Sequence, residues 1–220
     1  MADIQSSIVF SKETDAIINK KWTDPNFSHL NWSEDELLPL RKETRNYYRN
    51  LQKGFCSYCK QNVSLISASN GHIEHIVPKS IHIEFIFTPK NLCVICADCN
   101  QIKREQETLG IIPDTLKKVS TAKNKLYPRS SGAFKIVHPH FDNYDEHILI
   151  VKGLYVDKST KGHFTIGVCK LNRKLHVFGR SEEEIYDDRL SELMSGFLDD
   201  DNHFSRNEKL ITIKKLLEKK

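Results

Sequence analysis

The sequence predicts an α+β fold in which helices and short antiparallel strands surround a cysteine-rich centre. Two cysteine pairs, Cys56-x-x-Cys59 and Cys96-x-x-Cys99, bracket a segment with strand-like apolar runs. Before the first pair, apolar residues recur at helical spacing, and after the second pair both strand-like and helix-like patterns follow. We therefore expect a small strand–strand–helix core held by the cysteines, with a helical arm before it and a sheet plus helices after it.

Composition and charge limit the possible function classes. The chain has 220 residues, of which 39% are hydrophobic and 28% charged, and this balance excludes a mostly disordered or fibrous protein. Its net charge of +4 favours polyanionic partners only mildly. The sequence shows neither an export signal nor an apolar run long enough for a membrane helix, so we expect a cytoplasmic protein without membrane contacts.

Residues 1–54 are predicted to form an N-terminal helical arm. A helix is expected near residues 11–21, and a capping box at Ser33–Glu36 predicts the start of a second one. Its apolar face ends at Gly54, and Pro39 is compatible with the first helical turn.

Residues 55–112 are predicted to form the core, and residues 113–220 an accessory region. The core signals are a strand at 72–77, a loop containing Pro78, a strand at 92–95 and a helix from Ala97. In the accessory region, alternating patterns predict strands at 147–156 and 163–168, and residues 181–220 are helical in pattern. Acidic residues at 182–184 and lysines at the end suit the two ends of such helices.

The two cysteine pairs predict a structural zinc site. A reducing cytosol disfavours disulfides, and two pairs with this spacing supply four thiolates for one tetrahedral ion. Two buried cysteine pairs without a metal, or a redox motif, fit the sequence less well, because neither pair lies in a βαβ pattern. Cys93 and Cys169 are then expected to be buried free thiols.

The segment between the pairs contains the ingredients for phosphodiester hydrolysis. His75 can accept a proton from water near neutral pH, and it follows an acid, Glu74. Carboxylate and amide oxygens such as those of Glu74 and Asn100 are hard ligands that suit magnesium. Lysine and arginine side chains nearby could hold neighbouring phosphates.

Residues 55–109 resemble the HNH endonucleases, whose core is also called the ββα-metal or His-Me finger. The resemblance rests on CxxC, on IEHIVPKS at 73–80, on Asn91-Leu92, and on CxxCN-x-x-K at 96–103. It implies that His75 is the general base, that Glu74 and Asn100 hold a catalytic Mg or Mn ion, and that Asn91 ties the loop that orients the imidazole. It also implies that Cys56, Cys59, Cys96 and Cys99 bind structural zinc.

Two features of this segment depart from a simple match. The residue before the base is often aspartate in the family, whereas here it is Glu74, which is one methylene longer. Adjacent strand residues also point to opposite faces, so Glu74 and His75 can share a site only if the strand twists or ends there.

Other residues are weaker candidates. Lys79, Lys103 and Arg104 are expected to contact nucleic acid, the alternative being a solvated face. His72 could reach a metal or phosphate, although a packing role explains it more simply, and a polar loop explains the cluster at residues 138–142 as well as a second metal site does. The lysines at the C-terminus are read as ordinary helix-end residues rather than DNA contacts: Lys214, Lys215, Lys219 and Lys220.

The expected function is therefore metal-dependent hydrolysis of DNA. Two alternatives stay open: a zinc-stapled binding module without catalysis, and an RNase, because the metal chemistry does not forbid a 2′-hydroxyl. Residues 134–175 resemble, less specifically, the region after the HNH core in phage-defence nucleases of Septu-like and retron-linked systems. That resemblance implies an ATPase partner, and a homo-oligomer would allow cleavage of both strands.

Overall fold

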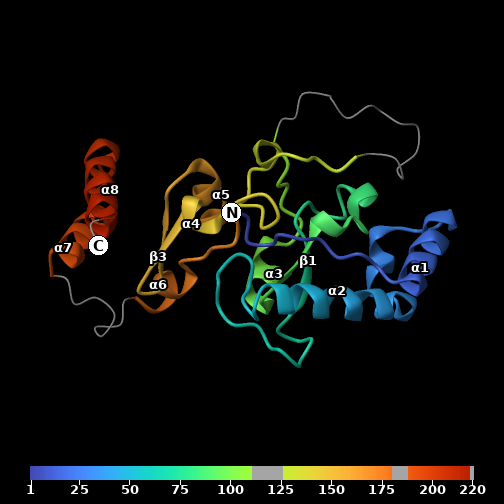
Figure 1. The fold of residues 1–220 in the computed structure, drawn as a ribbon. Helices are drawn as coiled ribbons and strands as arrows, with labels where there is room; N and C mark the ends of the chain where they lie inside the picture. Colours follow the sequence, from blue (N-terminus) through green and yellow to red (C-terminus); the bar gives the residue numbers. More distant parts are fainter. Residues whose placement is uncertain (111–125, 180–187, 219–220) are drawn as a thin grey trace.

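The computed structural model describes residues 1–110, 126–179 and 188–218, which form helices and two small antiparallel sheets (Figure 1). Helix α1 lies at one end of the molecule and α7 and α8 at the other, while α2 runs alongside β1. The predicted mixture of helices with small antiparallel sheets is confirmed. The predicted boundary at residue 112 falls outside the described residues.

The N-terminal arm contains the two expected helices. Helix α1 (Lys12–Thr23) begins after Ser11, whose hydroxyl accepts a hydrogen bond from the Thr14 amide. Helix α2 (Leu38–Leu51) has its proline in the first turn, as expected. The predicted capping box at Ser33–Glu36 is wrong, because two 3-10 helices, η1 (His29–Ser33) and η2 (Asp35–Leu37), precede α2 and the capping box belongs to Ser28.

The centre consists of two paired strands followed by a helix. Strands β1 (His72–His75) and β2 (Leu92–Ile95) are antiparallel, with His75 opposite Leu92 and His72 opposite Ile95. The loop between them carries η3 (Ile83–Phe85) and η4 (Pro89–Asn91). Helix α3 (Ala97–Lys103) starts directly after Cys96, which is its N-cap residue. Strand β1 is two residues shorter than predicted, because it ends at His75.

After residue 126 the chain forms short elements around a second two-stranded sheet. They are η6 (Ser131–Ala133), α4 (Tyr144–His147), β3 (Ile148–Val151), β4 (Leu154–Asp157), α5 (Thr160–Val168) and α6 (Arg173–Phe178). The alternating stretch at 147–156 is a hairpin rather than one strand, because Lys152 and Gly153 both have positive φ and form a two-residue turn.

The predicted strand at 163–168 is wrong, because these residues belong to helix α5. The hydroxyl of Ser159 accepts hydrogen bonds from the amide of Gly162, which caps the helix N-terminus. A side chain at residue 162 would place its Cβ 1.9 Å from the carbonyl oxygen of His147. Only glycine therefore allows α5 to approach the end of α4 this closely. The capping residue and this close contact outweigh the strand preference of the β-branched residues in the segment.

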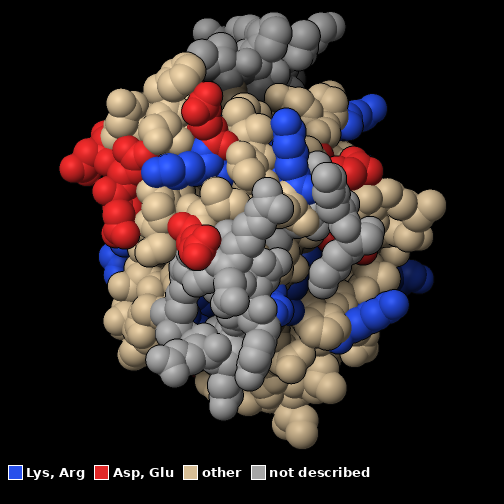
Figure 2. Space-filling model, turned by 90° about the vertical axis from the view of Figure 1, so that its left-hand side faces the viewer, with Lys and Arg blue, Asp and Glu red and all other residues tan. Residues whose placement is uncertain are grey.

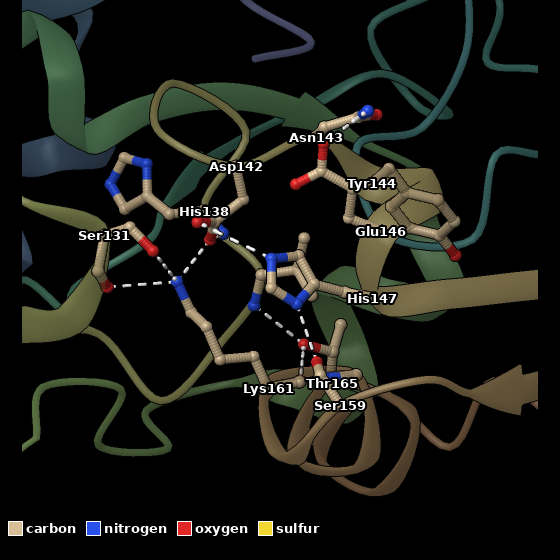
Figure 3. A network of polar contacts seen from close by, with 12 residues as sticks. Ser131, His138, Asp142, Asn143, Tyr144, Glu146, His147, Ser159, Lys161 and Thr165 are labelled. Atoms are coloured by element: carbon tan, nitrogen blue, oxygen red, sulfur yellow. Dashed lines mark hydrogen bonds and ion pairs between the residues drawn. The ribbon is translucent and has the colours of Figure 1, made fainter. Parts of the chain in front are cut away.

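A buried ion pair attaches α5 to the preceding chain (Figure 3). The ammonium of Lys161 contacts a carboxylate oxygen of Asp142 and the carbonyl oxygen of Ser131, the latter at 3.0 Å. His147 lies beside them, with Nδ1 2.6 Å from the hydroxyl of Ser159. These contacts hold together the turn at 138–142, α4 and the start of α5.

The C-terminal helices α7 (Asp188–Leu198) and α8 (His203–Glu218) pack on each other through a small separate core of Leu190, Met194 and Ile213. Lys214 forms an ion pair of 3.1 Å with Asp157 of β4. Figure 2 shows this end of the molecule, where acidic side chains gather at one edge beside basic ones. The acidic residues 182–184 and the last two lysines lie outside the described residues.

One main hydrophobic core joins the arm, the centre and the accessory region. Ile4 and Tyr48 come from the arm, Ile76 and Ile95 from the centre, and Tyr144 from the accessory region. A second cluster, built on Leu37, Leu40, Ile86 and Phe87, lies between the arm and the loop that joins β1 to β2. In the described part of the chain, no helix is both long enough and apolar enough to cross a bilayer.

Candidate active site

Four cysteines form a compact buried cluster beside the strand pair. The sulfur atoms of Cys56, Cys59, Cys96 and Cys99 all lie within 4.8 Å of one another, and none forms a disulfide. The chain turns back after the first pair at Lys60, whose φ is positive, and the second pair opens α3. Tetrahedral zinc with Zn–S bonds of about 2.3 Å requires sulfurs about 3.8 Å apart. The observed Cys59–Cys96 distance of 3.6 Å fits that geometry.

The remaining cysteines, Cys93 and Cys169, are buried free thiols outside this cluster, as expected. Burial raises the pKa of Cys93 to about 12, and it also raises the pKa of Cys169. Both side chains are therefore neutral packing residues rather than nucleophiles.

The end of β1 opens onto a cleft of about 1080 Å³ that several predicted site residues share. Glu74 and His75 both line it, although they are neighbours in sequence. They can do so because His75 is the last residue of the strand, where the regular alternation of side chains stops. Asn100 of α3 lines the same cleft.

Glu74 is buried, with one carboxylate oxygen engaged and the other not. Its Oε1 lies 2.5 Å from the Lys103 ammonium and accepts a hydrogen bond of 3.2 Å from the Tyr58 hydroxyl. Within the residues described, Oε2 has no hydrogen-bond partner. The carboxylate is thus held in place by two side chains while one oxygen stays available to a ligand in the cleft.

The imidazole of His75 is held by a backbone carbonyl from the loop between β1 and β2. Its Nε2 lies 3.0 Å from the carbonyl oxygen of Ile86, which can only accept, so Nε2 carries the proton and Nδ1 has a free lone pair. The edge of Trp32 packs at a centroid distance of 4.4 Å. Burial, reinforced by the charge of Lys79, lowers the pKa of His75 to about 3, so the ring is neutral near pH 7.

Asn91 ties the same loop by a full set of hydrogen bonds. Its side-chain oxygen accepts from the amide of Val77 at 2.7 Å, and its amide donates to the carbonyls of Val77 and Phe85 at 3.0 and 3.1 Å. Phe85 directly precedes Ile86, the residue that holds His75. Asn91 therefore fixes the part of the loop from which the imidazole is positioned.

The cations expected to contact nucleic acid have different surroundings. Lys79 and Arg104 line the cleft, Lys79 half-buried and Arg104 exposed. Lys103 is fully buried, with its ammonium on Glu74 and 3.3 Å from the carbonyl oxygen of His75. This burial speaks against the predicted contact between Lys103 and nucleic acid, because the side chain serves the carboxylate instead.

The weaker candidates are also accounted for. His72 lines the cleft and its Nε2 lies 2.9 Å from the carbonyl oxygen of Ser69. His138, His140 and Asp142 are buried and hydrogen-bonded to one another: the His138 amide donates to Asp142 at 2.7 Å and the His140 amide donates to His138 Nδ1 at 3.2 Å. His140 Nε2 lies 2.8 Å from the carbonyl oxygen of Leu92. In the described part of the chain, the arrangement that could hold a metal through histidine, cysteine or acidic side chains is the cysteine cluster.

Some cleft residues were missed by the sequence argument. Trp32 comes from η1, and Arg41 and Arg45 come from the face of α2 that meets β1. Tyr58 lies inside the first CxxC motif and supports Glu74, and Tyr127 of the accessory region donates a hydrogen bond of 3.0 Å to the Asn91 side chain. The four-residue spacing of the two arginines was the one signal that could have placed them together on the helix.

Comparison with known proteins adds one finding to this geometry. Residues 56–106 match the family model of the HNH endonuclease. This HNH segment contains the four clustered cysteines, both residues at the end of β1, Asn91 and Asn100. None of the curated proteins matches the chain. The family match supports a nuclease-type hydrolase that acts on nucleic acid.

Proposed function

We propose that this protein is a metal-dependent endonuclease that hydrolyses DNA phosphodiester bonds in the cleft at the end of β1. One observation carries the proposal: the cleft is lined by a carboxylate, an imidazole and an amide, each with an acceptor that no described residue engages. These acceptors are Glu74 Oε2, His75 Nδ1 and the side-chain oxygen of Asn100. The match of residues 56–106 to the HNH endonuclease model supports the same reaction class.

His75 is assigned as the general base. Its Nδ1 lone pair can take a proton from a water in the cleft, while the Nε2 proton stays on the Ile86 carbonyl and fixes the ring orientation. Because its pKa is about 3, nearly all of the protein carries the neutral ring at pH 7. The water oxygen then attacks phosphorus, and the 3′ oxygen leaves. General-base catalysis typically supplies about 10²- to 10⁴-fold, so other groups must contribute the rest.

Glu74 and Asn100 are assigned as the residues that would hold a magnesium or manganese ion. Their hard oxygen donors fit such an ion, and Glu74 keeps one oxygen clear of Lys103 and Tyr58. When bound, the ion would supply positive charge at the phosphate and at the leaving oxygen. Lys103 meanwhile compensates the carboxylate charge from the buried side.

The cysteine cluster is assigned as a structural zinc site. Four buried cysteines with sulfur positions close to tetrahedral spacing fit zinc, and the cluster lies next to β2 and α3. Purified protein should contain about one zinc per chain, and Cys59→Ser should lose it. The matched control, Cys93→Ser, changes a buried thiol outside the cluster and should retain the metal.

The nuclease assignment is tested by comparing His75→Ala with the unaltered protein on supercoiled plasmid in magnesium or manganese. Loss of the base should reduce cleavage by at least about 10²-fold, while the variant stays folded at the assay temperature and keeps the zinc content of the parent. His176→Ala removes an exposed histidine that does not line the cleft and should cut at the parental rate. Parental cleavage by His75→Ala would refute the assignment of this residue.

The same assay separates the alternatives. A binding module without catalysis would shift labelled DNA but leave it intact with either metal. An RNase would prefer structured RNA to single-stranded and duplex DNA when the three are compared under one set of conditions. The resemblance of residues 134–175 to phage-defence nucleases extends the proposal to defence with an ATPase partner. Protection from phage that disappears in cells carrying His75→Ala would support this setting.

A further inference from the structure

Helix α2 carries three arginines in a row on the side that faces β1 and the cleft. Arg41, Arg45 and Arg49 follow one another at four-residue spacing, which places them one above the other along the helix. The spacing brings like charges together, and a pair of this kind destabilises a helix by about 0.2–0.5 kcal/mol. All three precede the HNH segment, so the family match assigns them no role.

None of the three guanidinium groups has a carboxylate within ion-pair distance among the described residues. Arg41 donates to the carbonyls of Trp32 and Glu34, the latter at 2.7 Å. Arg45 donates from Nε to the carbonyl of Gly71 at 2.7 Å, and Arg49 donates to the carbonyls of Leu65 and Ser67. Backbone carbonyls hold the arginines in position but do not neutralise their charge.

Arg49 differs from the other two, because it is buried as a clamp on the loop before β1. Arg41 and Arg45 are half-buried and line the cleft together with Glu74 and His75. The two terminal nitrogens of Arg45 make no hydrogen bond to any described residue, although the residue is half-buried. Burial, together with the charges of Arg49 and Arg41, lowers the pKa of Arg45.

None of the three acidic residues of the cleft forms a hydrogen bond or an ion pair with Arg41 or Arg45 in the described part of the chain. Glu74 is paired with Lys103, and Glu107 accepts a hydrogen bond of 2.7 Å from His82. Glu105 is exposed and lies beyond ion-pair distance of both arginines. If the arginines served only to bind backbone carbonyls, this would explain the N–H groups that already donate hydrogen bonds. It would not explain the unbonded terminal nitrogens of Arg45, or the two positive charges without an acidic partner beside a predicted hydrolytic site.

We propose that Arg41 and Arg45 form a phosphate-binding wall that holds the backbone of the DNA strand next to the phosphodiester to be cut. This inference rests on the proposed function and extends the substrate site from the HNH segment to the N-terminal arm. Planar guanidinium groups with free, preoriented N–H donors suit phosphate oxygens, and fixing them on a helix reduces the side-chain entropy lost on binding. The wall positions the strand, and it reads no sequence.

The proposal is tested by DNA binding in a His75→Ala background, where cleavage does not interfere. The double variant Arg41→Gln/Arg45→Gln keeps amide donors for the backbone carbonyls but removes both charges. Its affinity for a short DNA duplex at 0.15 M salt should fall roughly 10- to 30-fold, and the slope of log K against log salt should decrease by about 2. Arg41→Lys/Arg45→Lys restores the charges and should recover most of the salt slope.

A matched control removes the same charge elsewhere. Lys12→Ala/Lys42→Ala deletes two exposed lysines of the arm that lie outside the cleft lining, and it should bind DNA with nearly parental affinity and slope. An equal loss in this control would show a general charge effect and overturn the proposal. Parental binding and slope in the glutamine variant would overturn it as well.

Two further measurements keep the test decisive. If the glutamine variant unfolds, a chemical protection experiment on the His75→Ala protein replaces it. Bound DNA should protect Arg41 and Arg45 from modification by phenylglyoxal, as measured by mass spectrometry. Absence of this protection refutes the phosphate-binding wall. In the cleavage-competent protein the glutamine changes should raise KM more than they lower kcat. If the parent protein binds DNA through the arginines but does not cleave it, the nuclease assignment is refuted and the phosphate-binding wall is supported. If the parent cleaves DNA and the glutamine variant has the same KM, the wall alone is refuted.

Discussion

The position at which β1 ends determines that the side chains of Glu74 and His75 line the same cleft. Side chains on a regular strand alternate between faces, yet both of these line one cleft because β1 ends at His75. The extra methylene of glutamate is compatible with this arrangement, since Oε1 reaches back to Lys103 and Tyr58 while Oε2 stays unengaged by described residues. Residue order alone therefore predicted a pair of residues that the structure places in one cleft, because the strand ends there.

The buried Glu74–Lys103 pair leads to a prediction about stability. Glu74→Gln removes the carboxylate charge and leaves the fully buried Lys103 ammonium without its partner, which should lower the free energy of unfolding by about 3 kcal/mol. Adding Lys103→Met removes the stranded charge, so the double variant should recover most of that loss. Urea denaturation of the parent, both single variants and the double variant, without added magnesium, measures the effect.

A result in which Glu74→Gln alone is as stable as the parent would show that the pair is not compensating a buried charge. The exposed Lys20 serves as a control, because surface pairs contribute little and Lys20→Gln, which breaks only its pair with Glu36, should leave stability nearly unchanged. Sequence spacing placed Lys103 on a helix near the site and favoured a surface contact. It could not show that the side chain turns inward, because that direction depends on packing against β1.

Among the elements, those with strong local signals were predicted well. Short apolar runs and turn signals located the two central strands and the start of α3, because these signals depend on neighbours within a few residues, whereas the capping box expected at Ser33–Glu36 was wrong. The prediction for residues 163–168 was wrong since a tertiary contact, Gly162 against the His147 carbonyl, helps to fix α5. Similarly, apolar periodicity predicted α2 but not its arginine wall, since periodicity reports the buried face and not the face that borders the cleft.

The loop between β1 and β2 depends on support from outside the HNH segment. The Tyr127 hydroxyl donates to the Asn91 oxygen at 3.0 Å, and His138 Nε2 lies 2.9 Å from the same hydroxyl. Because Asn91 holds the loop whose Ile86 carbonyl orients His75, this chain of hydrogen bonds joins the accessory region to the proposed base. The loop between β1 and β2 and the residues that support it therefore position the His75 imidazole together.

Removing the Tyr127 hydroxyl should weaken catalysis without weakening DNA binding. Tyr127→Phe keeps the ring between Phe85 and Phe134 but leaves the buried His138 nitrogen without its acceptor, which costs about 1–2 kcal/mol. We expect kcat to fall roughly tenfold through a looser imidazole, with an unchanged dissociation constant for DNA. Tyr144→Phe removes a buried hydroxyl that donates to Tyr58 instead, and it should lose similar stability with parental kcat. Equal kcat in both variants would argue against positioning.

For the molecule as a whole, the shared core makes the three sequence segments interdependent. The clustered cysteines pack in the same core as Ile4 of the arm and Tyr155 of the accessory region, and the Tyr155 hydroxyl donates to the carbonyl of Cys59 at 2.5 Å. The sequence indicated the local metal motif but not this sharing, because contacts between distant segments leave no local pattern. Loss of the metal is therefore expected to loosen both flanking segments along with the centre.

The buried histidines make the stability of this core dependent on pH. Burial, together with the charge of Lys90, lowers the pKa of His140 to about 4 against the hydrogen bond to the Leu92 carbonyl, and burial places the pKa of His138 well below its ordinary value. In the unfolded chain a histidine has a pKa of about 6.5, so between pH 6.5 and 4 the unfolded state binds protons that the folded state does not. The stability that these neutral rings provide is therefore complete above pH 6.5 and is lost as the pH falls toward 4.

We therefore expect the free energy of unfolding to fall by about 2 kcal/mol between pH 7 and pH 5 for His140 alone. The pKa of Glu36 is lowered to about 2 in the folded protein by its hydrogen bonds from Lys20 and Lys21, and the unfolded chain takes up this proton at about pH 4.3, so Glu36 contributes little to the slope between pH 7 and pH 5. His140→Gln keeps a donor for the Leu92 carbonyl without a titrating ring, so its urea midpoint should change less between pH 7 and pH 5 than that of the parent. The exposed His176→Gln variant should follow the parent, and identical pH slopes in all three proteins would show that burial of His140 does not control this transition.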